Sequence, residues 1–174
     1  MKKKTAIVYW LLPAKPQRDL FCEIVRILRK EFEAPNFEPH LTLFVTTKDR
    51  QSPAKVLQQI RSRPIRLNVR GVAFSPKFTK TLYVRFKPNP PLRKLVLDLG
   101  RAAKSRAKSP TDPHVSLLYK KTSRAAAQKE LARVMRLPFR TALFDSIAAV
   151  QMTLPVRTRA DVEAWRIVAK KSLR

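Results

Sequence analysis

The spacing of apolar residues along the chain predicts alternating strands and helices. A continuous apolar run from Thr5 to Leu12 is typical of a buried strand, whereas apolar residues recur at helical spacing between Pro16 and Phe32. A second strand is expected at Leu41 to Thr46. A serine followed by a proline then begins a predicted helix from Ser52 to about Arg63, because these residues suit an N-cap and a first turn.

The pattern continues with two strands and a helix. Ile65 to Phe74 and Thr81 to Phe86 alternate between apolar and polar residues, which predicts half-buried strands. The proline-rich KPNPP then stops the second strand, and a helix is expected from about Leu92 to Arg106. A short strand should follow at Val115 to Tyr119.

The last third of the chain is expected to hold one more helix and further strands. Ser123 is a candidate N-cap for a helix that runs through Met135. Phe139 to Thr153 contains strand-like material, and Trp165 to Val168 is the predicted last strand. This order of elements favours an α+β protein built from two related lobes, in a single domain that covers residues 1–174.

Charge narrows the range of partners. The 174 residues include 38 Lys and Arg against 12 Asp and Glu, a formal net charge of +26. Most single cations on a protein surface are simply solvated, but acidic residues are too few here to balance them. A phosphate-bearing ligand or a nucleic acid is therefore the expected partner.

The scarcity of particular residues excludes several common sites. With only two glycines, Gly71 and Gly100, the chain cannot build a phosphate-binding P-loop or a GxGxxG dinucleotide site. It has two histidines and one cysteine, so neither a three-histidine zinc site nor paired CxxC motifs can form. We therefore expect no metal and no cofactor.

Cysteine usage and hydropathy bear on the setting of the protein. Cys22 cannot form an internal disulfide, which favours a reducing, cytoplasmic environment, and its apolar neighbours predict a core thiol. The three lysines and short apolar run at the N-terminus resemble a weak secretory signal, but the run ends at Pro13 without a cleavage pattern, so a strand is preferred. No segment reaches the roughly 18 apolar residues of a membrane span.

Both histidines occupy the same seven-residue frame. Residues 38–44 read EPHLTLF and residues 112–118 read DPHVSLL, with an acid, proline, histidine, aliphatic, hydroxyl, leucine and apolar residue in that order. On a strand, positions i and i+2 share a face, so His40 should project with Thr42, and His114 with Ser116. Two buried histidines with purely structural roles would not need this repeat.

Two imidazoles beside two hydroxyls suit in-line displacement at phosphorus. One imidazole removes a proton from the attacking water or hydroxyl, and the other protonates the departing oxygen. Imidazole holds either protonation state near neutral pH. The hydroxyls of Thr42 and Ser116 would donate hydrogen bonds to the non-bridging phosphate oxygens.

The two motifs resemble those of the 2H phosphoesterase superfamily, which has paired H-x-[S/T]-x motifs with hydrophobic flanks. Here they are His40 to Leu43 and His114 to Leu117. Length, motif spacing and the segment PHVSLLY are similar to the cyclic phosphodiesterase branch, in which an aromatic corresponding to Tyr119 lines the substrate cleft. The resemblance implies two pseudo-twofold-related lobes of antiparallel sheet with flanking helices, a cleft between them and metal-independent catalysis.

Other aromatic residues are assigned less directly. The resemblance makes Phe78 the nearest match to an aromatic that contacts the nucleotide in that branch. Tyr119 lies five positions after His114, so it reaches the same side only if the strand bends or ends. Trp10 and Trp165 are expected in the core.

The resemblance implies an enzyme that opens a 2',3'-cyclic nucleotide or ADP-ribose 1'',2''-cyclic phosphate to a phosphomonoester. We also expect a monomer with no membrane partner. The basic charge keeps RNA ends open as the substrate, as in the related RNA cyclic phosphodiesterases and 2'-5' RNA ligases. A basic RNA-binding module is a different possibility, although no recognisable RNP, KH or zinc-knuckle motif is present. A serine hydrolase using Ser116, His114 and Asp112 would lack its GxSxG elbow and leave His40 unexplained.

Overall fold

The structure, a computed structural model, describes residues 3–47, 51–108, 110–120 and 125–174. Its elements are β1 (Lys4–Pro13), α1 (Gln17–Phe32), β2 (Leu41–Thr46), α2 (Pro53–Gln59), β3 (Ile65–Phe74), the 3-10 turn η1 (Phe78–Lys80), β4 (Leu82–Phe86), α3 (Pro90–Ala102), β5 (His114–Leu118), α4 (Ala125–Val134), β6 (Thr141–Leu154), α5 (Arg159–Glu163) and β7 (Arg166–Ser172). The α+β class predicted from the sequence is confirmed. The predicted N-cap Ser123 lies outside the described residues.

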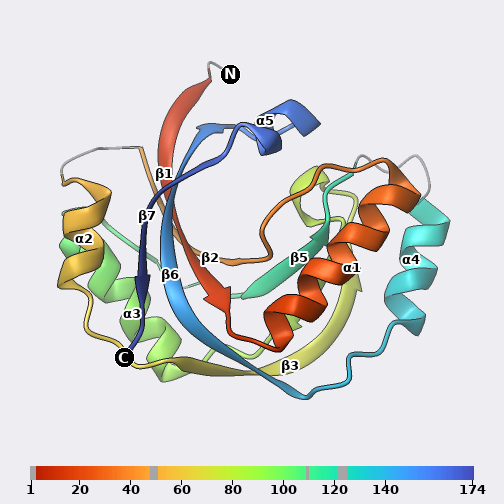
Figure 1. Cartoon of the computed structure of the whole chain (residues 1–174), viewed down its shortest axis with the longest axis horizontal. Coiled ribbons are helices and arrows are strands. Elements are labelled where there is room, and N and C mark those ends of the chain that lie inside the picture. The colour runs from red at the N-terminus through yellow and green to blue at the C-terminus, as the bar shows by residue number, and fades with distance from the viewer. Residues whose placement is uncertain (1–2, 48–50, 109, 121–124) are drawn as a thin grey trace.

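The seven strands form one antiparallel sheet in the order β1-β2-β5-β4-β3-β6-β7 (Figure 1). Strand β6 also pairs with β1, so the sheet closes on itself through six strands and leaves β7 as a branch on β6. The closure is weakest between β2 and β5, which share only the pair Leu41 and Val115. The two motif strands therefore meet at one point, immediately after each histidine.

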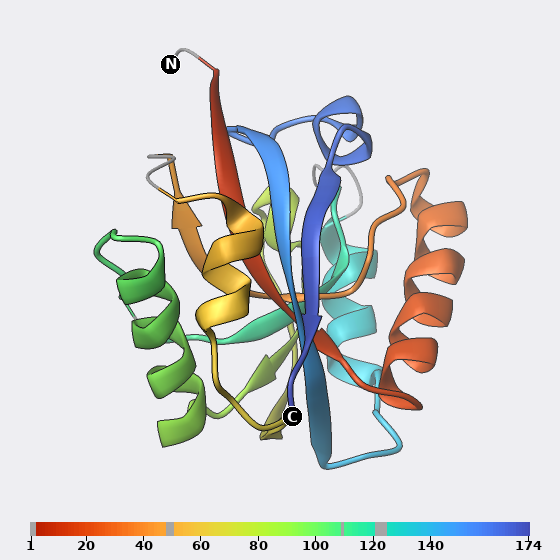
Figure 2. The same cartoon turned by 60° about the vertical axis from the view of Figure 1, so that its left-hand side comes forward.

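Helices cover the sheet in a repeated arrangement. Each motif strand is the second strand of a strand-helix-strand unit, β1-α1-β2 or β4-α3-β5. Helix α1 packs against β5 and α3 packs against β2, so each helix covers the motif strand of the other unit. Figure 2 shows α1 and α4 on one side of the sheet, with α2 and α3 on the other. This arrangement agrees with two related lobes.

The face of each motif strand that points away from the polar residues belongs to the main core. Leu41 and Leu43 are buried, as are Val115 and Leu117. These are the positions that the alternating pattern assigns to the core. Burial of these aliphatic side chains fixes which way each strand faces, so it also determines where the histidines project.

Several element boundaries differ from the predictions. Helix α2 ends at Gln59 rather than near Arg63, and α3 begins at Pro90 because Asn89 caps it, with its side chain accepting a hydrogen bond from the backbone N–H of Leu92. Pro90 and Pro91 of KPNPP thus form the first turn of α3, while β4 ends before this segment at Phe86, as predicted. The short α5 was not predicted, although Thr158 and Asp161 form a capping box at its start.

The prediction of a core thiol was wrong. Cys22 is exposed on α1. The buried stripe of this helix consists of Phe21, Val25, Leu28 and Phe32. Cys22 lies one position, about 100° of rotation, beyond Phe21 and therefore off the stripe.

Gly100 on α3 is required by close packing. A Cβ added there would lie 2.6 Å from the Cβ of Ala107 and 3.0 Å from the carbonyl oxygen of Ser105. We expect Gly100→Ala to lower the free energy of unfolding by about 1–3 kcal/mol, because the overpacked segment must shift. Urea denaturation would measure this, with exposed Leu97→Ala on the same helix as the control. A Gly100→Ala protein more stable than wild type, as helix propensity alone predicts, would contradict the packing account.

Candidate active site

One cavity of about 280 Å³ brings five of the six predicted site residues together. The five that line it are His40, Thr42, His114, Ser116 and Tyr119. Phe78 does not line the cavity, but its ring centroid lies 6.2 Å from that of Tyr119, so it packs behind the wall. Three larger cavities lie elsewhere among the described residues, and neither histidine lines any of them.

The strand register explains why the two motifs converge. Leu41 lies opposite Val115 in an antiparallel pair. In that register, the neighbours on either side also face each other, so His40 lies across from Ser116 and Thr42 lies across from His114. Each imidazole therefore has one hydroxyl beside it on its own strand and another across the strand pair.

Both imidazoles are held in the same way. Nδ1 of His40 lies 2.6 Å from the carbonyl oxygen of Glu38, and Nδ1 of His114 lies 2.8 Å from that of Asp112. A carbonyl oxygen can only accept a hydrogen bond, so Nδ1 carries the proton in each ring. In the neutral imidazoles, Nε2 is then the atom with a free lone pair for proton transfer.

His40 is the more deeply buried of the two histidines. Its ring stacks on the indole of Trp10, with a centroid distance of 3.6 Å and an interplanar angle of 9°. Burial lowers the pKa of His40 to about 4, although the hydrogen bond to Glu38 opposes the shift. The positive charge of a protonated His114 lowers it further. His40 is thus neutral near pH 7.

His114 is half-buried beside a cluster of charges. Burial lowers the pKa of His114, and Lys80 and Arg85 act in the same direction, whereas the carbonyl and carboxylate of Asp112 oppose the shift. The Asp112 carboxylate accepts hydrogen bonds from Lys80 at 2.6 Å and Arg85 at 2.9 Å. Asp112 therefore orients His114 through its backbone and fixes two cations near the cavity through its side chain.

The two hydroxyls differ in their present partners. Ser116 is buried and donates a hydrogen bond to the carbonyl oxygen of Thr79 at 3.1 Å, and it also contacts the hydroxyl of Tyr119. Burial raises the pKa of Tyr119 well above its usual value, so this hydroxyl stays protonated. Thr42 is exposed and lines the cavity, so its hydroxyl is the more accessible donor.

Aromatic residues build one wall of the site. The rings of Tyr119 and Phe37 stack at 4.0 Å, and Trp165 meets Trp10 edge to face at 5.3 Å. Tyr119 reaches the cavity because β5 ends at Leu118, as its expected role required. The assignment of Trp10 and Trp165 to the core alone was incomplete, since both line the cavity.

Two lysines complete the cavity lining. Lys77 precedes the η1 turn and Lys80 is its last residue, and both line the cavity with Thr79. The sequence placed them only within a broad basic stretch. The dense spacing of lysines around Phe78 is the one signal that pointed to this segment. Their charge gives the cavity a cationic edge that suits a phosphate group.

Protonation of His40 should make the protein less stable in acid. Its pKa is about 4 in the folded protein and about 6.5 when unfolded, so between these values the unfolded chain binds more protons. The free energy of unfolding should therefore fall by about 2 kcal/mol between pH 7 and pH 5. Urea denaturation at both pH values would measure this. His40→Gln should remove most of the loss, and an undiminished loss in that variant would contradict the assignment.

Among the residues that the structure describes, no group of three or more His, Cys, Asp or Glu side chains is placed to hold a metal ion. Among the same residues, no helix is both long and apolar enough to span a membrane.

Comparison with known proteins identifies the family. The sequence model of the 2'-5' RNA ligase superfamily matches residues 17–153, a region that includes both histidine motifs. The chain belongs to this superfamily. The resemblance to the 2H phosphoesterases, inferred from the paired motifs, is thereby confirmed. No curated protein sequence matches the chain.

Solved structures show the same fold. A phosphoesterase crystal structure aligns with a TM-score of 0.60 at 16% sequence identity, covering 97% of this chain and 98% of the other. E. coli LigT complexed with 3'-AMP gives a TM-score of 0.58 at 16% identity, covering 99% of both chains. The protein TT0787 of Thermus thermophilus gives 0.59 at 16% identity, covering 97% of this chain and 98% of the other. Superfamily membership supports an activity that cleaves phosphoesters or processes RNA ends.

Proposed function

We propose that the protein is a metal-independent phosphodiesterase that opens a 2',3'-cyclic phosphate, carried by a nucleotide or by an RNA end, to a phosphomonoester. The observation that carries this proposal is the equivalent placement of His40 and His114. Both rings line one cavity, and both donate Nδ1–H to a carbonyl two residues earlier. Each also has hydroxyl neighbours able to bind phosphate oxygens.

The proposed reaction needs one imidazole in each protonation state. His40 acts as the base, because its burial keeps it neutral. Its Nε2 takes a proton from water while the water oxygen forms a bond to phosphorus. His114 acts as the acid, because the bound phosphate raises its pKa and Asp112 favours its charged form. The bond from phosphorus to the leaving ribose oxygen breaks, and that oxygen receives the proton from Nε2 of His114.

Charge on the phosphate is stabilised from two directions in this proposal. Thr42 donates a hydrogen bond to one non-bridging oxygen, and Ser116 can turn from the carbonyl of Thr79 to donate to another. Lys77 provides a cation at the cavity edge. Proton exchange with solvent afterwards restores neutral His40 and protonated His114.

Two other functions are less well supported. A serine hydrolase would need Ser116 activated by His114, but the Ser116 hydroxyl donates to a backbone carbonyl instead. It would also leave His40, stacked and oriented in the same cavity, without a task. An RNA-binding module with a vestigial site would not need two imidazoles held in matching tautomers.

The proposal is tested by offering purified protein four substrates in the presence of a chelator. These are 2',3'-cyclic AMP, an RNA oligonucleotide with a 2',3'-cyclic phosphate end, ADP-ribose 1'',2''-cyclic phosphate, and 3',5'-cyclic AMP as the control. We expect a phosphomonoester from at least one of the first two and none from the control. No product from either 2',3'-cyclic phosphate would contradict the proposed function.

A further inference from the structure

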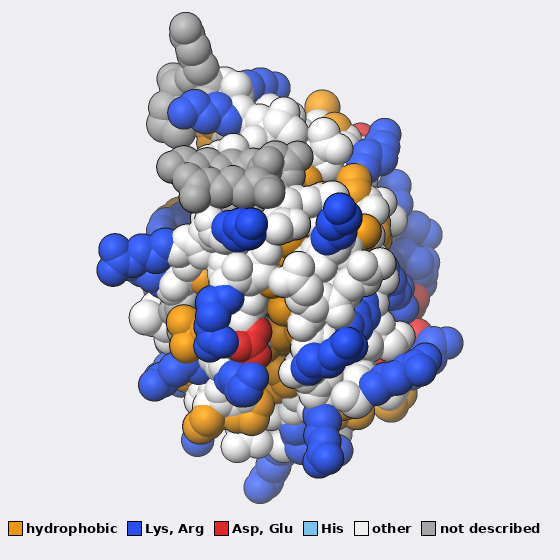
Figure 3. Space-filling view, turned by 90° about the vertical axis from the view of Figure 1, so that its left-hand side faces the viewer, with side chains coloured by type: hydrophobic (Ala, Val, Ile, Leu, Met, Phe, Trp, Pro, Cys, Tyr) orange, Lys and Arg blue, Asp and Glu red, His pale blue; other side chains and the backbone are white. Residues whose placement is uncertain are grey.

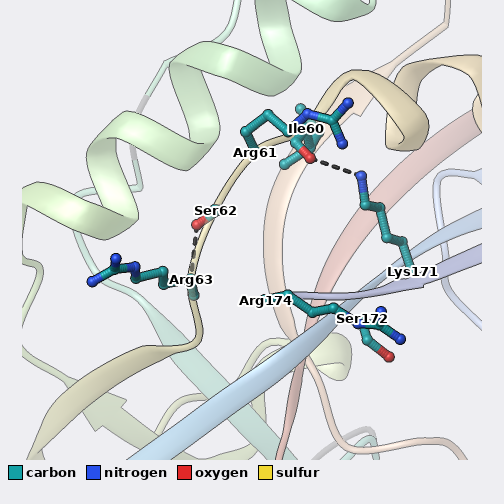
Figure 4. A pocket seen from close by; sticks show the side chains of 7 residues that line it. All are labelled: Ile60, Arg61, Ser62, Arg63, Lys171, Ser172 and Arg174. Atoms are coloured by element: carbon teal, nitrogen blue, oxygen red, sulfur yellow. Dashed lines mark hydrogen bonds between the residues drawn. The ribbon is translucent and has the colours of Figure 1, made fainter.

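A second cavity, which the proposed reaction does not use, lies where the end of α2 meets the end of β7. It has a volume of about 560 Å³, and seven residues line it (Figure 4): Ile60, Arg61, Ser62, Arg63, Lys171, Ser172 and Arg174. The segment after α2 and the segment after β7 are joined here, because the backbone N–H of Arg174 donates to the carbonyl oxygen of Ser62 at 3.1 Å. The cavity therefore has a defined backbone frame.

The side chains of this cavity carry four positive charges and no negative one. Within the described part of the chain, none of Arg61, Arg63, Lys171 and Arg174 has a carboxylate within 4.0 Å. A terminal carboxylate at Arg174 would offset one charge and leave three. Cations gathered without counterions repel one another, and a bound anion would relieve that repulsion.

One of the four cations is fixed in place. Lys171 donates hydrogen bonds from Nζ to the carbonyl oxygens of Ile60 at 2.8 Å and Gln58 at 3.1 Å, which closes the end of α2. Burial lowers the pKa of Lys171, and the charge of Arg61 lowers it further. Figure 4 shows the side chains of Arg61 and Lys171 facing each other, whereas the side chain of Arg63 points away from them. Lys171 holds the frame, while the arginines supply free donors.

The surface around this cavity is also basic. Figure 3 shows the side of the molecule that carries α2 and α3, where Lys and Arg side chains are spread widely and little acidic surface separates them. Asp98 of α3 is already engaged by Lys94 and Arg101. The cavity therefore opens onto a surface that attracts an extended polyanion rather than a single small anion.

The cavity is separate from the catalytic one. Trp165 lines the active site immediately before β7 begins, and Lys171 and Ser172 line the second cavity at its other end. Six residue steps along a strand span about 20 Å. A single nucleotide in the active site would not reach that far.

We propose that this cavity is a non-catalytic site that binds backbone phosphates of a single-stranded nucleic acid. Arginine suits this role because its planar guanidinium binds phosphate through two parallel hydrogen bonds. Phosphate binding at this site increases the affinity of the protein for a single-stranded nucleic acid. It does not contribute to the chemistry at His40 and His114. Phosphate binding here does not depend on the proposed reaction.

The test uses the double substitution Arg61→Ala with Arg174→Ala and a 20-nucleotide RNA with a 3'-hydroxyl end, which presents no cyclic phosphate. Binding is followed by fluorescence anisotropy over a range of salt concentrations. We expect affinity at low salt to fall about tenfold or more, and the slope of log affinity against log salt to decrease by about 1.4, which is 0.7 for each lost phosphate contact. Turnover of 2',3'-cyclic AMP should match that of wild type.

The matched control removes the same charge elsewhere. Lys30 on α1 and Lys129 on α4 are exposed, lie on the opposite side of the sheet from α2, and have no ion pair among the described residues. Lys30→Ala with Lys129→Ala should change affinity and slope much less than the arginine pair. Equal losses in the two double variants would show diffuse attraction to total charge and overturn the site, as would unchanged binding in the arginine variant. Thermal melts establish that both variants are folded.

Discussion

Replacing either histidine with alanine should lower kcat/KM for a 2',3'-cyclic phosphate substrate by about 10³-fold or more. General acid–base catalysis contributes about 10² to 10⁴ at each step, and the proposed reaction uses one imidazole for each of its two proton transfers. His40 and His114 cannot replace each other, because each is tied through Nδ1 to its own carbonyl. Steady-state kinetics on the preferred substrate measures the effect.

The interpretation requires that the variants stay folded. His40→Ala removes a ring that stacks on Trp10, so a thermal melt must show that this variant is folded. His40→Asn is a second, polar variant that loses less side-chain volume. Trp165→Phe is a useful comparison, because it changes the aromatic wall and leaves both imidazoles intact. A folded His114→Ala protein that keeps wild-type activity would contradict two-histidine catalysis.

Replacing Thr42 with valine should lower kcat by about 10²-fold while leaving the fold intact. Removing one hydrogen-bond donor that faces a developing oxyanion typically costs this much. Valine has nearly the same shape as threonine and suits a strand, so the cavity loses a hydroxyl and little else. Thr42 is exposed at the cavity, which makes a packing defect a minor concern. Kinetics at saturating substrate separates kcat from KM.

The conservative variant of the same position is the control for this effect. Thr42→Ser keeps the hydroxyl and should retain most of the activity. A Thr42→Val enzyme that loses substrate affinity but keeps kcat would assign Thr42 to ground-state binding instead. Equal activity of wild type and Thr42→Val would remove Thr42 from the proposed site.

The histidine motifs were predictable because their signal is local. Alternation along a strand places residues i and i+2 on one face, and the leucines on the opposite face are buried in the core. His40 with Thr42 and His114 with Ser116 therefore follow from a few neighbouring letters. Their joint presence in a chain with two histidines also indicated that the strands converge, and the pair Leu41 and Val115 is where they meet.

The rest of the site depends on long-range register, which a single sequence does not specify. Trp10 reaches His40 because β1 pairs with β2 so that Trp10 lies opposite Thr42. Within an unbroken apolar run, nothing distinguished this tryptophan from its buried neighbours. Trp165 depends on α5, whose five residues are too short to give a helical pattern, so only the capping pair Thr158 and Asp161 marked it.

The stacking of Trp10 on His40 also explains how two similar motifs would take different roles in the proposed reaction. The imidazole of His40 stacks on the indole of Trp10, and burial keeps it neutral. The imidazole of His114 is half-buried and lies among the charged side chains of Lys80, Arg85 and Asp112. A repeated motif by itself would give two equivalent groups. The surrounding residues give them different affinities for a proton, which acid–base catalysis requires.

The central claim, that both imidazoles act on one phosphate, is tested most directly by nitrogen NMR of the protein labelled with 15N-histidine. The chain has only two histidines, so the spectrum reports His40 and His114 alone. Titration with 3'-AMP should shift the Nε2 signals of both rings along one binding curve, with Nδ1 protonated in each. A shift confined to one ring, or two curves with different dissociation constants, would contradict a shared phosphate site.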